Sequence, residues 1–313
     1  MRVAAIDLGT NSTRLLVADV EGDELHEVVR RLTITRLGEG VDARRRLLPL
    51  PIARVRNCLA DYRRVLEEYG ANRTLAIATS SVRDAENGEA FLGEIEWSYG
   101  FTTRLLDGAE EAALMFQGVL AGREPVGEAL LVDIGGGSTE LVGVSDGRAP
   151  ESASLDVGCV RLTERFLASD PPTSSELAAA AGYVRALLPR LAPEHAIGVA
   201  GTVTTLAALD LGIVHYDPER THGHCISRDA VERELQRLAA LTQDERMRVA
   251  GIEPGRAEVI VAGLVILREI MDACGLAEIE ASERDILHGA ALAAAELPEP
   301  AELPAPPGAY ACC

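Results

Sequence analysis

The feature of this sequence that most constrains its fold is a short motif that occurs twice. In the first copy, an apolar run ends at Asp7, and a turn containing Gly9 follows. In the second copy, a similar run ends at Asp133, and three glycines follow before Ser138. Short apolar runs that stop at glycine turns indicate buried strands. The motif therefore predicts two similar halves, each built around a buried strand that ends in an aspartate.

Two further strands are expected after each copy of the motif. They cover residues 14–20 and 25–35 in the first half, and residues 140–144 and 151–157 in the second. Turn residues separate the strands of each pair, which is typical of an antiparallel meander. Residues 121–128 lie between the halves and resemble a linker, because they contain two glycines and a proline.

In the rest of the chain, segments with apolar residues at helical spacing alternate with short continuous apolar runs. Apolar residues at helical spacing, or glycine stops, predict helices at 51–69, 86–99, 110–120, 175–191, 203–210, 228–240, 243–248, 257–274 and 285–295. Short apolar runs predict strands at 74–79, 102–106, 196–200 and 278–281. We therefore expect an α/β fold with one domain at 1–123, a second at 124–297, and a disordered Pro-rich tail at 298–313.

Composition excludes several classes of function. The net charge is −19, which disfavours binding to nucleic acid by bulk electrostatics. No run approaches the roughly 18 apolar residues of a membrane span, and the N-terminal apolar run is interrupted too early for a signal peptide. The six cysteines fit no zinc or redox spacing. These observations predict a cytoplasmic protein with no membrane partner.

The basic residues are unusual, because the chain has no lysine and all 30 of them are arginine. Arginine binds phosphate through a bidentate fork, so this composition is compatible with phosphate chemistry. Base composition of the genome is the alternative explanation. With a net charge of −19, any attraction for a polyanion must come from cations local to the site.

Three glycine turns are candidate phosphate loops. The first runs from Asp7 to Ser12, and the second runs from Asp133 through Gly135, Gly136, Gly137 and Ser138 to Glu140. Glycines let a backbone approach a phosphate closely, and acids at these positions can hold Mg²⁺ directly or through water. The third turn, Gly201-Thr202, opens a helix whose N-terminus attracts anions. The alternatives are polar hairpin turns for the first two loops and N-capping by Thr202 for the third.

Two further segments allow both a structural and a chemical interpretation. Glu110 and Glu111 open a helix, where they could complement its dipole or supply a general base that activates water. Arg83 follows a strand, where it could clamp a phosphate or lie in a surface turn. His222 and His224 lack other zinc ligands at the right spacing, so we interpret them as structural or near the substrate.

Taken in order, these motifs resemble those of the exopolyphosphatase and guanosine pentaphosphate phosphatase family, in a short two-domain form. The resemblance rests on the following segments: 7–12, 78–85 (Ala-Thr-Ser-Ser-Val-Arg-Asp-Ala), 108–112 (Gly-Ala-Glu-Glu-Ala), 133–140, 201–205 and 282–289 (Ser-Glu-Arg-Asp-Ile-Leu-His-Gly). It implies two actin-like (ribonuclease H-like) ATPase-type domains with the active site in the cleft between them.

The resemblance also implies roles for residues. Glu111 would be the catalytic base. Asp7, Asp133 and Glu140 would bind Mg²⁺, for which Mn²⁺ could substitute. The groups that would bind substrate phosphate are Asn11, Ser12, Arg83, Gly135, Gly136, Gly137, Ser138, Gly201 and Thr202.

The expected function is that of an exopolyphosphatase, which releases terminal orthophosphate from inorganic polyphosphate. Longer family members carry additional helical domains that help to hold the polymer and support dimers, so their absence favours short chains here. Guanosine pentaphosphate is the alternative substrate. An ATP-dependent kinase or chaperone of the same fold, or a non-enzymatic sensor of nucleotide or polyphosphate, is the alternative of another class. A homodimer is expected.

Overall fold

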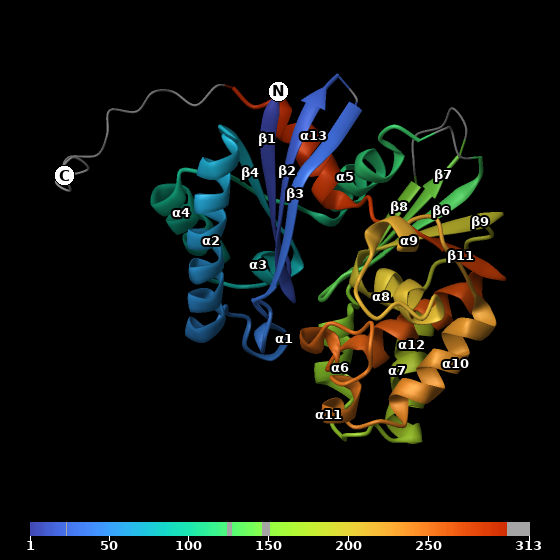
Figure 1. Ribbon diagram of the computed structural model, residues 1–313. Helices are drawn as coiled ribbons and strands as arrows, with labels where there is room; N and C mark the ends of the chain where they lie inside the picture. Colours follow the sequence, from blue (N-terminus) through green and yellow to red (C-terminus); the bar gives the residue numbers. More distant parts are fainter. Residues whose placement is uncertain (23, 124–126, 146–150, 299–313) are drawn as a thin grey trace.

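The structure is a computed structural model that describes residues 1–22, 24–123, 127–145 and 151–298. The chain forms two α/β halves that lie side by side, with two helices between them at one end (Figure 1). None of the described helices combines the length and the apolar character that a membrane span requires. All of the predicted tail at 298–313 except Pro298 lies outside the described residues.

The first sheet has five strands in the order β3-β2-β1-β4-β5. Their bounds are β1 Arg2–Leu8, β2 Ser12–Glu21, β3 Glu24–Ile34, β4 Arg73–Ala78 and β5 Thr102–Leu105. The first three form the predicted antiparallel meander, and β4 and β5 add in parallel. Residues 3–8 of β1 are buried, as expected for the centre of a sheet covered on both faces.

The second sheet repeats this topology. Its order is β10-β11-β9-β6-β7-β8, with bounds β6 Ala129–Ile134, β7 Thr139–Val144, β8 Glu151–Leu155, β9 His195–Val199, β10 Cys225–Ser227 and β11 Glu278–Ala281. The strands β8-β7-β6-β9-β11 follow the same order and directions as β3-β2-β1-β4-β5. The short strand β10 is an antiparallel addition at the edge. The predicted duplication and the actin-like α/β class are therefore confirmed.

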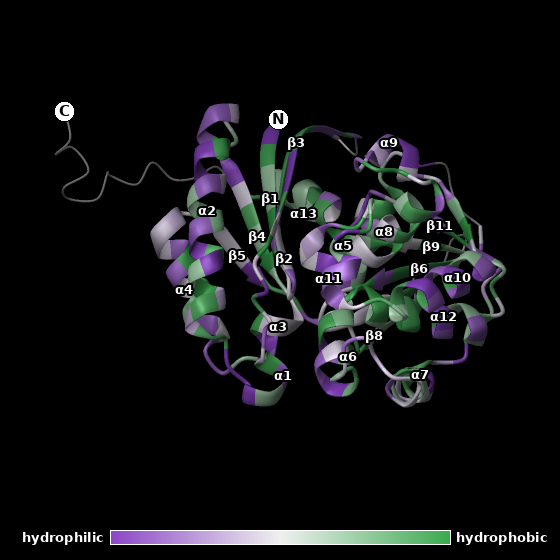
Figure 2. Ribbon diagram, turned by 60° about the horizontal axis from the view of Figure 1, so that its bottom comes forward, coloured by the Kyte–Doolittle hydropathy of each residue, from purple (hydrophilic) through white to green (hydrophobic). Residues whose placement is uncertain are grey.

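Helices cover the faces of both sheets. In the first half they are α1 Val41–Arg44, α2 Pro49–Tyr69, α3 Ser80–Arg83, α4 Gly88–Tyr99 and α5 Gly108–Leu120. In the second half they are α6 Cys159–Phe166, α7 Ser174–Leu187, α8 Ala200–Asp210, α9 Pro218–Thr221, α10 Arg228–Ala239, α11 Gln243–Arg246 and α12 Ile260–Cys274. The last helix, α13 Ile286–Ala295, follows β11 in the chain but covers the first sheet. Figure 2 shows polar residues on the outer faces of α2 and α10 and apolar residues toward the sheets. This is the amphipathic pattern on which the helix predictions rest.

Several elements differ from the predictions. The helix expected from residue 203 begins at Ala200, and the helix expected from residue 257 begins at Ile260 because Pro254–Arg256 forms a 3-10 turn. The helices α1, α3, α6 and α9 were not predicted. Three of these have four residues and α6 has eight. None is therefore long enough for a repeated helical spacing of apolar residues to be recognised in the sequence.

The last helix crosses from one half to the other. It follows β11 of the second sheet, yet α13 packs against α5 and against the strands β1, β2 and β4 of the first sheet. The backbones of α5 and α13 touch, since a Cβ atom at Gly118 would overlap Asp285 O and one at Gly289 would overlap Leu114 O. The segment after β11 therefore returns to the first half and places Asp285 near the end of β1. The boundaries at 123/124 and 297/298 stay predictions.

Candidate active site

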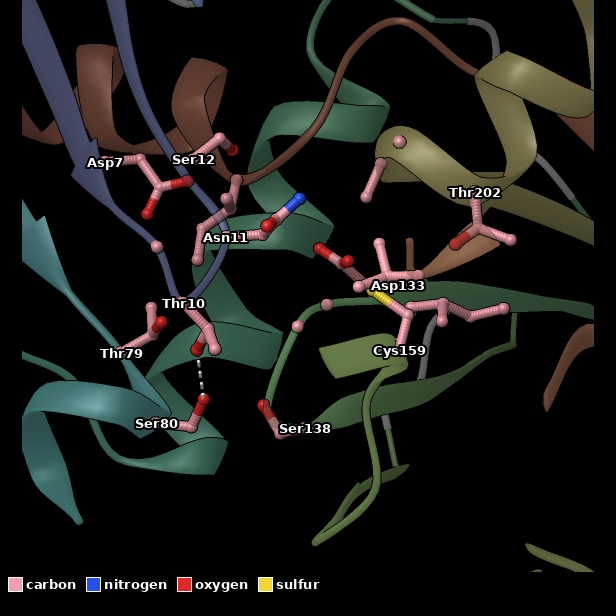
Figure 3. A pocket seen from close by; sticks show the side chains of 18 of the residues that line it. Asp7, Thr10, Asn11, Ser12, Thr79, Ser80, Asp133, Ser138, Cys159 and Thr202 are labelled. Atoms are coloured by element: carbon pink, nitrogen blue, oxygen red, sulfur yellow. Dashed lines mark hydrogen bonds between the residues drawn. The ribbon is translucent and has the colours of Figure 1, made fainter. Parts of the chain in front are cut away.

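A cavity of about 110 Å³ lies where the ends of the two sheets meet. Figure 3 shows Asp7 and Asn11 on one wall and Asp133 and Thr202 on the other, with the amide of Asn11 directed toward Asp133. The predicted site residues that line this cleft are Asp7, Asn11, Ser12, Glu111, Asp133, Gly135, Gly136, Ser138, Glu140, Gly201 and Thr202. Two predicted residues lie just behind it: Arg83 contacts Glu111, and Gly137 packs against Ser80.

The two motif turns have the same local structure. Gly9 N donates to Ser12 O at 3.0 Å, and Gly135 N donates to Ser138 O at 3.0 Å. The second turn also comes very close to the first half, because a Cβ atom at Gly136 would lie 2.7 Å from Thr10 Cβ and one at Gly137 would lie 2.5 Å from Ser80 Oγ. Both turns therefore connect the strands of a hairpin, and Gly136 and Gly137 of the second turn are needed for the close approach of the two walls.

Asp7 and Arg14 form a buried ion pair in the first wall. Arg14 Nε and Nη2 both donate to Asp7 Oδ2, at 2.9 and 2.7 Å. The other oxygen, Asp7 Oδ1, is buried and has no partner among the described residues. Burial raises the pKa of Asp7, although the charge of Arg14 opposes this effect.

Two acids stand opposite in the second wall. Burial raises the pKa of Asp133 to about 7, with Arg14 acting in the other direction. Burial and the neighbouring Glu111 and Asp133 raise the pKa of Glu140 well above its usual value, although Ser154 Oγ donates to Glu140 Oε1 at 2.8 Å. The free-energy cost of ionising Asp133 and Glu140 is highest when the cleft contains no cation.

The acids fit a hard divalent cation in the chemistry of their donors, since all are oxygens and Asp7 Oδ1 is unpartnered. Within the described part of the chain, no three carboxylate, imidazole or thiol groups come together closely enough to hold a metal ion by themselves. A cation between these walls would need water and phosphate oxygens among its ligands, which is the usual environment of Mg²⁺.

The two acids at the start of α5 differ in their contacts. Glu110 forms a capping box with Asp107, so it takes the structural role of complementing the helix N-terminus. Glu111 is only 5% exposed and faces the cleft. Arg83 Nη1 donates to Glu111 Oε1 at 2.5 Å. Burial raises the pKa of Glu111 to about 7, against the opposing effect of Arg83.

Arg83 does not lie in a surface turn. It is the last residue of the short helix α3, and its Nη1 also donates to Leu106 O at 2.6 Å. These contacts fix the guanidinium behind Glu111. Arg83 therefore orients a carboxylate of the cleft and does not line the cleft itself.

The third loop is held by an arginine that the motifs did not identify. Ala200 has a positive φ of 64°, which turns the chain sharply from β9 into α8. The N-cap of α8 is Val199, so Thr202 does not cap the helix. Arg256 Nη1 donates to Gly201 O at 3.0 Å and to Thr205 Oγ1 at 2.8 Å, and Arg256 lines the cleft.

A signal for Arg14 was present in the sequence. The alignment of the two motifs extends from Asp7-Leu8-Gly9-Thr10-Asn11-Ser12-Thr13-Arg14 to Asp133-Ile134-Gly135-Gly136-Gly137-Ser138-Thr139-Glu140, which makes Arg14 the counterpart of Glu140. Arg256 lies in no motif and has no such signal. His222 and His224 lie outside the cleft and make structural contacts, the former accepting from Glu283 N and the latter pairing with Asp210.

The duplicated fold, the facing glycine turns and the acids between them define an actin-like α/β protein whose cleft is suited to phosphoryl groups. Comparison with known proteins agrees. Residues 16–296 match the model of the Ppx/GppA phosphatase family, and the chain belongs to this family.

The similar proteins include one named as an exopolyphosphatase and one named as a guanosine-5'-triphosphate,3'-diphosphate pyrophosphatase. The chain is 41% identical to exopolyphosphatase 2 of Mycobacterium tuberculosis, over 94% of this chain and 98% of that protein. It is 28% identical to a guanosine-5'-triphosphate,3'-diphosphate pyrophosphatase of Aeromonas salmonicida, over 86% of this chain and 54% of that protein.

Solved structures give the same result. The crystal structure of an exopolyphosphatase from Cytophaga hutchinsonii has a TM-score of 0.84 at 26% identity, covering 92% of this chain and 96% of that chain. The Ppx/GppA family member of Aquifex aeolicus has a TM-score of 0.78 at 30% identity, covering 95% of this chain and 97% of that chain.

Proposed function

We propose that this protein is a hydrolase of phosphoanhydride bonds that removes the terminal phosphoryl group from inorganic polyphosphate. The observation that carries the proposal is the buried carboxylate of Glu111, which Arg83 holds at the cleft between the two glycine turns. The 41% identity to a mycobacterial exopolyphosphatase, over nearly the whole of both chains, supports polyphosphate as the substrate.

Glu111 is the proposed general base. A base that deprotonates water works best when its pKa lies near the working pH, and the pKa of Glu111 is about 7. The Arg83 contact fixes one oxygen, Oε1, so that the other can accept the proton of a water molecule. That water would attack the terminal phosphorus in line with the leaving phosphate.

Asp7, Asp133 and Glu140 are the proposed ligands of Mg²⁺, directly or through water, and Mn²⁺ could take its place. A bound divalent cation neutralises charge on the phosphoryl oxygens as it builds up in the transition state. A cation would also stabilise the charged forms of these three acids, since burial disfavours those forms and raises the pKa of each.

The phosphoryl group is proposed to lie between the glycine turns. Backbone N–H groups of Gly136 to Ser138 and of the first turn of α8 are suited to bind its oxygens, as are Asn11 and Ser12, while Gly135 lines the cleft with its N–H held inside the turn. Since Arg14 and Arg256 line the same cleft, they can supply the local positive charge that the net charge of −19 requires.

A second cavity of about 430 Å³ shares Arg14 and Arg256 with the cleft and is also lined by Arg30 and Arg31. It is the proposed place for the rest of the substrate. A cavity of this size holds a few phosphate units, which favours short polymers.

Guanosine pentaphosphate is the second candidate, and one observation favours it. The larger cavity has apolar lining from Leu32, Val214 and Tyr216 as well as arginines. Each of these three side chains is at least 41% exposed, so a nucleoside could cover them.

The test is phosphate release from polyphosphates of defined length and from guanosine pentaphosphate, with Mg²⁺ and with chelator. Release from polyphosphate with a higher kcat/KM supports the first proposal, whereas a preference for guanosine pentaphosphate supports the second. Tight binding of either compound without release would contradict both and indicate a sensor. Phosphate transfer to an acceptor, with no release in its absence, would indicate a kinase.

A further inference from the structure

Arg14 is held between two buried carboxylates that lie at opposite ends of the chain. Its Nε and Nη2 donate to Asp7 Oδ2, and its Nη1 donates to Asp285 Oδ2. Asp285 comes from the N-terminus of α13 and is 2% exposed. No motif role was assigned to Asp285. It does not line the cleft of about 110 Å³, but it lies in the wall of the adjoining cavity of about 430 Å³, together with Arg14.

Asp285 is itself firmly anchored. Its Oδ1 accepts from Leu287 N at 2.9 Å, and its backbone N donates to His288 Nδ1 at 3.2 Å. Because that ring nitrogen accepts, the proton of a neutral His288 is on Nε2, which lies 2.8 Å from Glu27 Oε1 and donates to it. Asp285 is thus tied to α13 and, through His288, to β3. Arg30 is a second cation beside its carboxylate, at 3.5 Å.

The anchored carboxylate limits how Arg14 can pair with Asp7. A guanidinium has five N–H groups and readily forms a two-oxygen fork with a single carboxylate. Here both bonds to Asp7 go to Oδ2, and Oδ1 stays unpartnered among the described residues. If Asp285 did not hold Nη1, Arg14 could turn and take both oxygens of Asp7. After this rotation of the Arg14 side chain, Asp7 Oδ1 would no longer be available to a cation, and the remaining N–H groups of Arg14 would point away from the cleft.

We propose that Asp285 is a positioning residue of the active site, which acts by holding the guanidinium of Arg14 in the orientation that phosphoryl binding requires. The inference rests on the proposed hydrolysis in this cleft. It goes beyond that function because it gives the last helix a part in the site. Asp285 touches neither the reacting phosphate nor the water.

The test separates this role from that of a helix cap. Serine caps helices about as well as aspartate, so Asp285→Ser keeps a cap and removes the oxygen that holds Arg14. Asp285→Asn is the nearly isosteric second variant, in case the serine variant folds poorly. We expect kcat/KM to fall at least tenfold in both, while the thermal midpoint changes by only a few degrees. Glu269→Gln is the matched control, since it removes a buried carboxylate that pairs with the exposed Arg185 and lines neither cavity, and it should leave kcat/KM unchanged.

Two further measurements test whether Asp285 acts on the active site through Arg14. In an Arg14→Gln background, adding Asp285→Ser should cause no further loss in kcat/KM. The Arg14 side-chain N–H signals in NMR spectra, assigned through the Arg14→Gln variant, should shift in Asp285→Ser and stay in place in Glu269→Gln. Unchanged kcat/KM in both Asp285 variants, losses that multiply in the double variant, or unmoved Arg14 signals would overturn the inference.

The NMR measurement does not need catalysis. If the wild-type protein released phosphate from neither polyphosphate nor guanosine pentaphosphate, the proposed function would fail. Shifted Arg14 signals in Asp285→Ser would then still support the positioning of Arg14 by Asp285, and unmoved signals would still contradict it.

Discussion

Arg14 and Glu140 occupy equivalent positions in the two halves of the fold. Arg14 pairs with Asp7 across the β1–β2 hairpin, and Glu140 pairs with Asp133 across the β6–β7 hairpin. Because the two positions are equivalent, the opposite charges of Arg14 and Glu140 make the two walls of the cleft electrostatically different. One wall of the cleft pairs an acid with a cation, and the other wall carries two acids that need a cation from solution. In the proposed mechanism, Arg14 of the first wall contacts the phosphate, and Asp133 and Glu140 of the second wall bind the metal together with Asp7.

Glu140→Gln should therefore weaken metal binding more than it weakens catalysis at saturating metal. An amide oxygen is a poorer ligand for a hard divalent cation than a carboxylate. We expect the Mg²⁺ concentration for half-maximal phosphate release to rise about tenfold or more. The measurement is a Mg²⁺ titration of initial rates. An unchanged midpoint would remove Glu140 from the metal site.

Glu111→Gln should lower kcat by about 10²–10⁴-fold, the usual contribution of a general base. Substrate binding should change little, because the amide keeps the size of the side chain and can still contact Arg83. Glu110→Gln is the matched control, since Glu110 lies one residue earlier and serves the helix cap. Steady-state kinetics with both variants check this. Similar losses in the two variants would point to damage to α5, and near-full turnover in Glu111→Gln would reject the base.

The stability of the metal-free protein should fall as the pH rises from about 5 to 7. Burial raises the pKa values of Glu111 and Asp133 to about 7, whereas free carboxyl groups titrate near 4. In this interval the folded chain holds protons that the unfolded chain has lost, so the free energy of unfolding decreases with pH and levels off above about 7.

Thermal unfolding in chelator at a series of pH values measures this slope. Mg²⁺ should raise the midpoint more at pH 8 than at pH 5, since the carboxylates are then charged and ready to bind. A Glu111→Gln, Asp133→Asn double variant should show a weaker slope. A midpoint that rises from pH 5 to pH 7 in chelator would contradict the assignment.

A second set of ion pairs joins the two halves away from α13. Arg165 of α6 donates to both oxygens of Asp42 at 2.6 and 2.5 Å, and Arg161 of α6 contacts Asp84, next to the residue that holds Glu111. Asp42→Asn should lower the free energy of unfolding by about 1 kcal/mol and raise KM. The difference from wild type should shrink in 0.5 M salt because exposed ion pairs are screened. Denaturant titrations at low and high salt measure it, and equal stability at low salt would show that this contact contributes nothing.

Gly136→Ala should reduce kcat/KM about tenfold by pushing the two glycine turns apart. The new Cβ would lie 2.7 Å from Thr10 Cβ, which is closer than such atoms can approach. Gly93→Ala is the control, since a Cβ there meets nothing within 4 Å and the residue lies inside α4. That control should leave kcat/KM unchanged and stabilise the protein by about 0.5–1 kcal/mol. Full activity in Gly136→Ala would show that the walls need not approach so closely.

Much of the fold was readable from the sequence because its signals are local. The buried run before Asp7, the glycines after it and the second copy at Asp133 predicted both sheets. The apolar spacing in 51–69 and the αL stop at Gly70 predicted α2. The same local patterns singled out the turns that contain Asn11, Ser12, Asp133 and Ser138 as candidate phosphate loops, whereas a cleft shared by these turns was expected from the resemblance to the family.

Only the tertiary structure decided how these groups are charged and held. Sequence patterns could not tell that Glu111 is buried while Glu110 caps the helix, because both stand in the same helical turn. They could not place Asp285 beside Arg14, 271 residues away, or bring Arg256 to Gly201. Such contacts depend on the return of α13 to the first sheet and on packing across the cleft. The pKa values of the acids depend in turn on burial, which is a property of the assembled chain and not of any segment.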